Sequence, residues 1–452
     1  MTDRSLDAVL EAVRERVTPD PAEREQLEGA AETALERARA AVEEHEVDGT
    51  VRLVGSASRN TWLPDEKDID VFVAVPPELD RDGLEATGLA IGHAVLPDGR
   101  EAYAEHPYVT GSIDGVTVDV VPCFDVEDSA ASRSAVDRTP FHADYVEERL
   151  DAGLAAEVRV LKQFLRGVGI YGSDLKTRGF SGYLTELLVL EHGSARAVLQ
   201  AAGGWHPPVR LDPEDHGERS FDAPLVVVDP TDPIRNVASV LTRTNLARFQ
   251  HHARDVLAEP AVDRWFPDPR EPINAPAVRE HVRERGTTPV AMVFDRPDLV
   301  DDELYPQLRK SLDGLGDALA RHGFPAVRQR AFAAHRTVLW FELETTARPT
   351  VERHQGPPVH VREHAERFLE QYAGDPAVYG PFIDEDRYVV ERHRAFPSAV
   401  EFLESDAVFE ARLGPAVSRQ LEAGYELMIG EDVAGLAEEF GAELAAYFDP
   451  RP

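Results

Sequence analysis

The chain has 452 residues, of which 42% are hydrophobic, and this is enough apolar material for more than one folded core. No apolar run is long enough to cross a bilayer, and charge begins at Asp3, unlike the start of a secretory signal. Cys123 is the single cysteine, so an intrachain disulfide is excluded and a reducing cytoplasm is the expected compartment.

Acidic residues outnumber basic residues by 83 to 48, which gives a net charge of −35. This excess is spread along the whole chain, a pattern typical of halophilic proteins in which concentrated salt screens like-charge repulsion. An acidic protein adapted to ordinary salt is the alternative. The total charge argues against a nucleic-acid partner, because phosphate binding relies on Lys and Arg, although a local basic groove would outweigh it.

Residues 1–142 predict a mixed sheet flanked by helices. Apolar residues at helical spacing indicate two helices over residues 4–47, divided by the proline-rich stretch 18–22. The remaining predicted elements are strands at 51–54 and 71–75, a helix at 78–95, and strands at 103–113 and 116–121. Asp114-Gly115 between the last two strands is a strong signal for a tight hairpin.

The most informative motif lies in this first region. A small turn, Gly55-Ser56, precedes an apolar strand that is entered by Asp68 and Asp70. Alternate side chains of a strand share a face, so the two acids project to the same side. Asp119 supplies a third carboxylate from the predicted strand 116–121. Beside a turn that opens a short helix, these acids predict a site for Mg²⁺ and a triphosphate, and thus two-metal nucleotidyl transfer.

Two further residues of the motif can contact phosphate. The Ser56 hydroxyl can donate a hydrogen bond, and Arg59, about one helical turn later, can pair with the triphosphate. Gly-Ser alone is more simply an ordinary turn, and the two acids alone could be solvated residues at a loop end. The acid–apolar–acid pattern on an apolar strand, combined with Asp119, favours the functional interpretation.

Residues 143–262 predict a helical domain, and residues 263–452 predict a separate α+β domain. The expected helices of the middle region lie near 154–167, 183–191 and 235–257, with an irregular stretch rich in Pro, Gly and Asp at 203–233. The adjacent His251 and His252 lack a convincing third metal ligand, and we expect them on a solvated helix face. The predicted fold class is therefore α+β multidomain.

These motifs resemble the DNA polymerase β-like nucleotidyltransferase superfamily, in which Gly-Ser or Gly-Gly precedes an acid–apolar–acid strand and a third acid follows on a later strand. More narrowly, the chain resembles the archaeal class I CCA-adding enzymes, which are tRNA nucleotidyltransferases. The stretches that carry this resemblance are 54–62, 103–108, 118–123, 134–142, 171–172, 178–183, 229–238, 356–359 and 380–382.

The resemblance implies serial addition of C, C and A to the 3′ end of tRNA from CTP and ATP, without a nucleic-acid template and with release of pyrophosphate. It implies Mg²⁺ as the cofactor. The implied metal ligands are Asp68, Asp70 and Asp119, and the implied nucleotide contacts are Ser56, Arg59, His142, Lys162, Tyr171 and Arg235. In the family, an arginine at the position of Arg235 helps to select C or A over other bases.

The residues by themselves leave four of these positions open. His142 at a helix start can be structural, Lys162 can be a surface lysine, and Tyr171 can be a packed aromatic. Arg235 can form an ion pair with Asp232 at a helix start.

The resemblance also assigns a role to each domain. Residues 1–142 would be catalytic, 143–262 would form the helical central domain, and 263–452 would contact the tRNA acceptor arm. The alternatives are a poly(A) polymerase-like or small-molecule nucleotidyltransferase, or an inactive RNA-binding relative, which the intact acid trio opposes. The oligomeric state stays open, with a homodimer as one option, and no membrane partner is expected.

Overall fold

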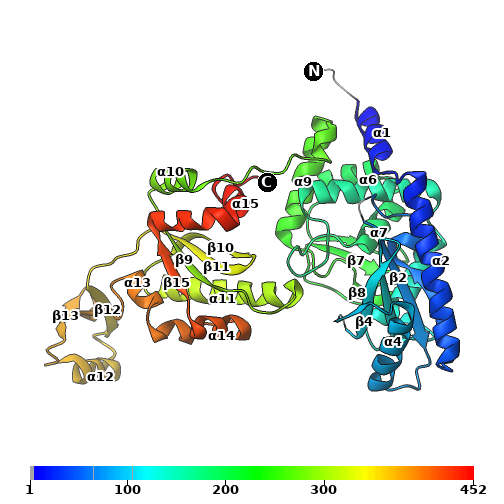
Figure 1. Ribbon diagram of the computed structural model, residues 1–452. Helices are drawn as coiled ribbons and strands as arrows, with labels where there is room; N and C mark the ends of the chain where they lie inside the picture. The colour runs from blue at the N-terminus through cyan, green and yellow to red at the C-terminus, as the bar shows by residue number, and fades with distance from the viewer. Residues whose placement is uncertain (1–4, 65, 104) are drawn as a thin grey trace. The chain divides into compact units, whose positions relative to one another are not determined.

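The computed structural model describes residues 5–64, 66–103 and 105–452, which form two compact units (Figure 1). Unit 1 comprises residues 1–268 together with Pro452, and unit 2 comprises Pro269–Arg451. Each unit has its own buried apolar clusters, so each has its own core. The α+β multidomain class predicted from the sequence is confirmed.

A five-stranded mixed sheet forms the N-terminal part of unit 1. The strands follow the order β1-β2-β5-β4-β3, in which β2 and β5 are parallel and the other neighbours are antiparallel. Their bounds are β1 Thr50–Val54, β2 Asp68–Val75, β3 Arg100–Tyr103, β4 Pro107–Ile113 and β5 Val116–Phe124. The strand predicted over 103–113 is thus two strands, and Ala104 between them lies outside the described residues. Asp114 and Gly115 both have positive φ, as the predicted tight hairpin requires.

Helices α2 (Pro21–Glu44) and α4 (Arg81–Val95) pack on this sheet. Helix α2 begins with a capping box, because Asp20 accepts from the amide of Glu23 while the Glu23 side chain accepts from the amide of Asp20. The buried face of α2 carries mainly alanines, and α4 contributes Leu84 and Ile91 to the shared core.

The rest of unit 1 is mainly helical. Its helices are α1 Leu6–Val17, α5 Thr139–Glu147, α6 Ala152–Val168, α7 Gly182–His192, α8 Ala195–Gly204 and α9 Arg243–Ala258. Phe164, Phe249 and Trp265 meet in its core, with ring centroids 5.3 Å apart between Phe164 and Trp265 and 6.1 Å apart between Phe164 and Phe249. Burial of such large rings supplies much of the stabilisation of a helical core.

The prediction for residues 203–257 was wrong in two places. The stretch expected to be irregular contains strands β6 (Val209–Leu211) and β7 (Leu225–Asp229), and β8 (Asp232–Asn236) replaces the start of the expected helix. Strand β7 is buried throughout, so its apolar run shows no alternation with polar residues that would mark it as a strand. Arg235 therefore lies on a hairpin strand that pairs with β7, and not on a helix.

Unit 2 contains two sheets. The larger sheet is antiparallel, with the order β10-β11-β9-β15, and the smaller sheet has the order β12-β14-β13. The strands are β9 Thr288–Asp295, β10 Ala326–Ala333, β11 Arg336–Leu343, β12 Val351–Pro358, β13 Val378–Asp384, β14 Arg387–His393 and β15 Glu426–Ile429. The helices are α10 Ala275–Arg285, α11 Asp301–Arg321, α12 Arg362–Tyr372, α13 Ala399–Leu403, α14 Pro415–Ala423 and α15 Ala437–Phe448. Short 3₁₀ turns complete the chain at η1 Ser129–Ala131, η2 Val136–Arg138, η3 Val262–Arg264, η4 Asp406–Glu410 and η5 Gly430–Leu436.

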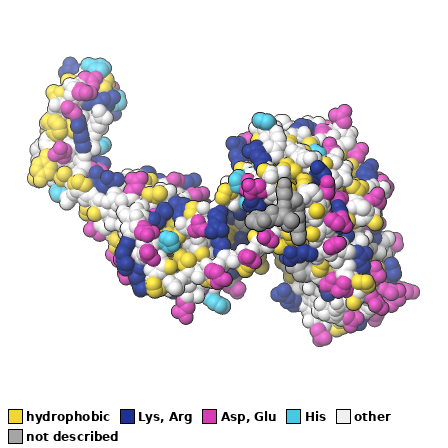
Figure 2. Space-filling model, turned by 90° about the horizontal axis from the view of Figure 1, so that it is seen from above, with side chains coloured by type: hydrophobic (Ala, Val, Ile, Leu, Met, Phe, Trp, Pro, Cys, Tyr) yellow, Lys and Arg dark blue, Asp and Glu magenta, His cyan; other side chains and the backbone are white. Residues whose placement is uncertain are grey.

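The surface carries charges of both signs. On the face seen in Figure 2, Lys and Arg side chains are interspersed with Asp and Glu over both units. Several arginines pair with acids, as Arg138 does with Asp232 at 3.4 Å. None of the helices in the described part of the chain is long and apolar enough to cross a membrane.

Candidate active site

Gly55 and Ser56 lie in α3 (Gly55–Ser58), a single helical turn between β1 and β2. Gly55 has a φ of +78°, and a Cβ built on it would lie 2.2 Å from Oδ2 of Asp70. A side chain at this position would therefore displace Asp70, so glycine is required both by its backbone angle and by the close approach. The predicted short helix exists, but one turn contributes little dipole to an anion site.

The three predicted metal ligands come from the two parallel strands of the sheet. Asp70 on β2 is paired in register with Asp119 on β5, so the two side chains project from the same face of neighbouring strands. Asp68 lies two residues earlier on β2, on that same face, and is exposed. The structure thus brings the three acids together at one sheet face.

The acids repel one another because little positive charge lies among them. Burial raises the pKa of Asp70 to about 6, with further contributions from Asp119 and Asp68, while Arg59 acts in the opposite direction. Burial also raises the pKa of Asp119, against the effect of a hydrogen bond from Thr110. Oδ1 of Asp119 is buried and has no hydrogen-bond partner in the described part of the chain.

This donor set fits a divalent cation. All the ligand atoms are carboxylate oxygens, which Mg²⁺ prefers. An orphaned buried oxygen and an elevated pKa are what carboxylates show when their countercharge is not supplied by the protein. Asp68, Asp70 and Asp119 are accordingly the residues that could hold Mg²⁺.

Arg59, which the sequence predicts to pair with the triphosphate, contacts a buried acid of the protein. Its Nε donates to Oε1 of Glu186 on α7 at 3.1 Å, and its Nη2 lies 3.1 Å from Oε2 of the same residue. The Thr61 hydroxyl donates to Oε1 of Glu186 at 2.7 Å. Glu186 is completely buried, so this acid fixes the orientation of the guanidinium.

Lys162 and Tyr171 meet at the start of α7. A Cβ built on Gly182 would lie 3.4 Å from the Tyr171 hydroxyl oxygen and 3.7 Å from Nζ of Lys162. Lys162 is buried on α6, not on the surface, and its ammonium donates to the Thr61 hydroxyl at 3.4 Å. Burial lowers the pKa of Lys162, and Glu186 partly offsets this. Arg59, Lys162 and Tyr171 therefore form one group around the N-terminal part of α7.

His142 and Arg235 both contact another buried acid, Asp229 on β7. Nε2 of His142 lies 2.8 Å from Oδ2 of Asp229, and Nη1 of Arg235 donates to the same oxygen at 2.5 Å. The His142 ring stacks on Tyr183, with centroids 4.2 Å apart. The ion pair with Asp232 that the sequence suggested for Arg235 is not formed; Arg138 pairs with Asp232 instead.

Glu186 and Asp229 are the residues that the sequence analysis did not single out. Glu186 lies within the mainly apolar stretch Leu184–Leu188, Asp229 directly follows the apolar run Leu225–Val228, and each acid has zero exposure. Such acids are almost never fully buried unless they are paired, so this pattern was the available signal.

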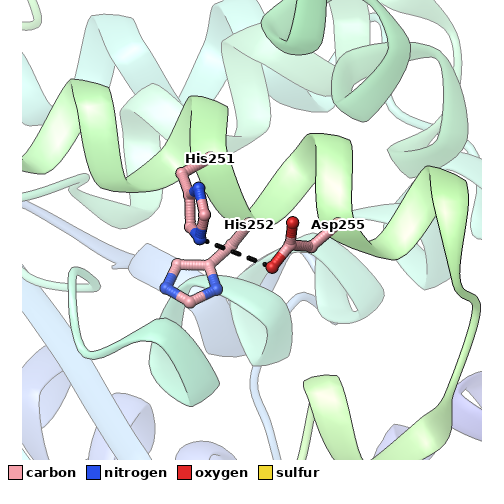
Figure 3. A group of neighbouring side chains, drawn as sticks. All are labelled: His251, His252 and Asp255. Atoms are coloured by element: carbon pink, nitrogen blue, oxygen red, sulfur yellow. Dashed lines mark ion pairs between the residues drawn. The ribbon is translucent and has the colours of Figure 1, made fainter. Parts of the chain in front are cut away.

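His251 and His252 do have a third neighbour. Asp255, one turn further along α9, brings a ligand atom within 4.8 Å of one atom of each histidine. Figure 3 shows the three neighbouring side chains on this helix. Nε2 of His251 lies 3.4 Å from Oδ2 of Asp255, and that oxygen lies 3.7 Å from Nη1 of Arg264. The expectation that a third ligand is lacking was therefore wrong, although Asp255 already takes part in ion pairs.

Comparison with known proteins covers almost the whole chain. Residues 35–142 match the model of a nucleotidyltransferase domain, 156–266 that of the second domain of tRNA nucleotidyltransferase, and 285–430 that of the C-terminal domain of the CCA-adding enzyme. The chain is 55% identical to the CCA-adding enzyme of Haloarcula marismortui and 53% identical to that of Halorubrum lacusprofundi, in each case over 99% of both chains. It is 40% identical to the CCA-adding enzyme of Methanosarcina barkeri, over 94% of this chain and 95% of that one. The halophilic character predicted from the charge agrees with the two haloarchaeal relatives.

Proposed function

This chain belongs to the CCA-adding enzyme family, and from that premise we propose that it adds C, C and A in turn to the 3′ end of tRNA from CTP and ATP. The observation that supports the proposal is the pairing of Asp70 with Asp119 on neighbouring parallel strands, which gathers the carboxylates on one face of the sheet. The chain around this site is similar to CCA-adding enzymes over almost its full length. Nucleotidyl transfer depends on positioning and charge neutralisation, and the site is organised for both.

Mg²⁺ is the proposed cofactor, held by Asp68, Asp70 and Asp119. When bound, it would supply positive charge to the triphosphate and lower the pKa of the attacking 3′ hydroxyl. Gly55 keeps the main chain at Ser56 close to Asp70, so the Ser56 hydroxyl is proposed to donate to the triphosphate beside these acids.

The cationic group at α7 is proposed to bind phosphate. Glu186 fixes Arg59 through one edge of the guanidinium, which leaves Nη1 for the nucleotide. Lys162 has three ammonium donors and one hydroxyl partner, Thr61, within the described part of the chain. A buried ammonium with unused donors is stabilised by an anion, and the Tyr171 hydroxyl beside it can donate as well.

The domain roles follow from the same premise. We propose that residues 1–142 carry the chemistry, that 143–262 contribute to the nucleotide site, and that 263–452 contact the acceptor arm of tRNA. The cytoplasm is the proposed compartment, since the single cysteine is buried and unpaired.

The direct test is incubation of the purified protein with tRNA that lacks CCA, labelled CTP and ATP, Mg²⁺ and concentrated KCl. The expected product is tRNA extended by three nucleotides and no more. Asp70→Ala and Asp119→Ala should each reduce the rate by about 10³-fold, because each removes an oxygen ligand from the charge-stabilising site.

Asp125→Ala is the matched control, since Asp125 is an exposed acid directly after β5 and should leave the rate unchanged. A long tail made from ATP alone would instead support the poly(A) polymerase alternative. Full activity of Asp70→Ala would refute the proposed site.

A further inference from the structure

Helix α9 carries three side chains of the kind that bind transition metals, His251, His252 and Asp255. One ligand atom of each residue lies within 4.8 Å of those of the other two. Asp255 follows His251 by four residues and His252 by three, and these are the two spacings at which helical side chains meet. Both imidazoles therefore reach one carboxylate, and Figure 3 shows the three side chains pointing toward one another.

The distances within this group suit a tetrahedral metal ion. Two ligands of such an ion lie about 3.3 Å apart, because each is about 2.0–2.1 Å from a zinc ion at the centre. Nε2 of His251 lies 3.4 Å from Oδ2 of Asp255, which is close to that spacing. The two imidazole rings are also near each other, with centroids 5.1 Å apart. A small side-chain rotation of His252 would complete three ligands around one ion.

The carboxylate of Asp255 remains able to bind a cation. Nη1 of Arg264 lies 3.7 Å from Oδ2 of Asp255, and its Nη2 lies 3.9 Å from Oε2 of Glu259. Both distances are longer than a hydrogen bond, so this guanidinium attracts the two acids without occupying a lone pair of either. The side chains of His251 and Asp255 are 46% and 36% exposed, so an ion and its water ligands can enter from solution.

A hydrogen bond orients the His252 ring. Its Nε2 lies 3.1 Å from the main-chain oxygen of Pro452. That oxygen can only accept, so Nε2 carries the ring proton and Nδ1 of the neutral ring keeps its lone pair. Burial lowers the pKa of His252, which favours the neutral ring. Metal-bound histidines commonly donate their second ring N–H to a main-chain oxygen in this way.

We propose that His251, His252 and Asp255 form a binding site for a divalent transition metal of the Zn²⁺ class. Two imidazole nitrogens and one carboxylate oxygen supply three ligands, and water supplies the fourth. Imidazole suits Zn²⁺, whereas Mg²⁺ prefers sites made only of oxygen, so this site differs in chemistry from the three acids of the sheet. The inference does not rest on the proposed function.

The test is calorimetric titration of ZnSO₄ into the purified full-length protein at about pH 8, where imidazole is neutral. Excess Mg²⁺ is included, because it occupies the all-oxygen site and competes poorly for imidazole. One zinc ion per chain should bind under these conditions. His251→Ala, His252→Ala and Asp255→Asn should each weaken zinc binding at least about tenfold, since loss of a mere second-shell partner already costs about 10–100-fold.

Two further variants control for binding elsewhere. His206→Ala removes an exposed histidine of unit 1 outside the group, and Asp70→Ala disables the acidic site of the sheet; both should retain the wild-type zinc affinity. Circular dichroism shows which variants are folded, and any folded member of the three ligand variants is sufficient for the test. Unchanged affinity in a folded ligand variant, or zinc binding that excess Mg²⁺ abolishes in the wild type, would overturn the inference.

Discussion

Asp70 and Asp229 are both aspartates withdrawn from water on strands of unit 1, and their pKa values shift in opposite directions. For Asp70, burial is reinforced by the neighbouring Asp119 and Asp68, and the pKa rises to about 6. For Asp229, His142 and Arg235 outweigh burial, and the pKa falls. The chain provides countercharge at one aspartate and withholds it at the other. Asp70, which lacks countercharge, is suited to binding a cation, whereas Asp229, which is paired with cationic side chains, is suited to holding those side chains in place.

The largest loss of stability is expected at Glu186, because this buried acid, like Asp229, is paired with cationic side chains of the protein. Glu186→Gln would remove the charge that faces Arg59 and Lys162, and would leave two shielded cations without their buried partner. Breaking a buried pair in this way typically costs about 3–5 kcal/mol, so the free energy of unfolding should fall by about that amount. Denaturant titration in concentrated KCl measures it.

Glu191→Gln is the control for that variant, because Glu191 lies on the same helix and is exposed. It should unfold at the wild-type denaturant concentration. If Glu186→Gln were equally stable, Glu186 would not be the partner that compensates the two cations.

The comparison also marks what the sequence can predict. The pattern of Asp68, Asp70 and Asp119 is local, so alternation along strands was enough to predict a shared face, and the structure places them there. Arg59 and Arg235 were harder, because their partners, Glu186 and Asp229, are 127 and 6 residues away and lie on elements whose packing is not encoded in local spacing.

The hairpin of β7 and β8 shows the same limit. The apolar run of β7 carries no strand periodicity because every residue of this strand is buried. The surrounding stretch is rich in Pro, Gly and Asp, so irregular structure was expected there and a helix from Arg235 onward. Since the hairpin determines where Arg235 and Asp229 lie, the error in secondary structure concealed the contact between these two residues.

The raised pKa of Asp70 predicts that the stability of the protein depends on pH. The ordinary pKa of 3.8 rises to about 6 in the folded, metal-free protein, so the folded state binds this proton more tightly than the unfolded state does. The free energy of unfolding should therefore decrease as the pH rises from about 4 to about 6. At higher pH it should stay at this lower value, because Asp70 is then ionised in both states. Asp70→Asn should remove this pH dependence and stabilise the metal-free protein at pH 7 by about 3 kcal/mol.

The measurement is denaturant titration at several pH values with EDTA present. Asp229→Asn should change the free energy of unfolding in the opposite direction and destabilise the protein at neutral pH. The lowered pKa of Asp229 contributes stability that is present above its unfolded pKa and is lost as the pH falls through the folded value. Equal pH profiles for wild type and Asp70→Asn would show that the pKa of Asp70 is not raised in the folded protein.

The smallest change in the free energy of unfolding is expected at an acid that is exposed to water and forms a single surface ion pair. Asp317 of unit 2 lies 2.6 Å from Arg412, and the two side chains are 58% and 72% exposed. Water and salt screen such a pair, so Asp317→Asn should change the free energy of unfolding by no more than about 0.5 kcal/mol. Measuring the variant in low and high KCl checks this, since any residual loss should shrink as salt increases. A loss as large as that of Glu186→Gln would mean that distance alone, and not withdrawal from water, decides how strongly an acid acts in this protein.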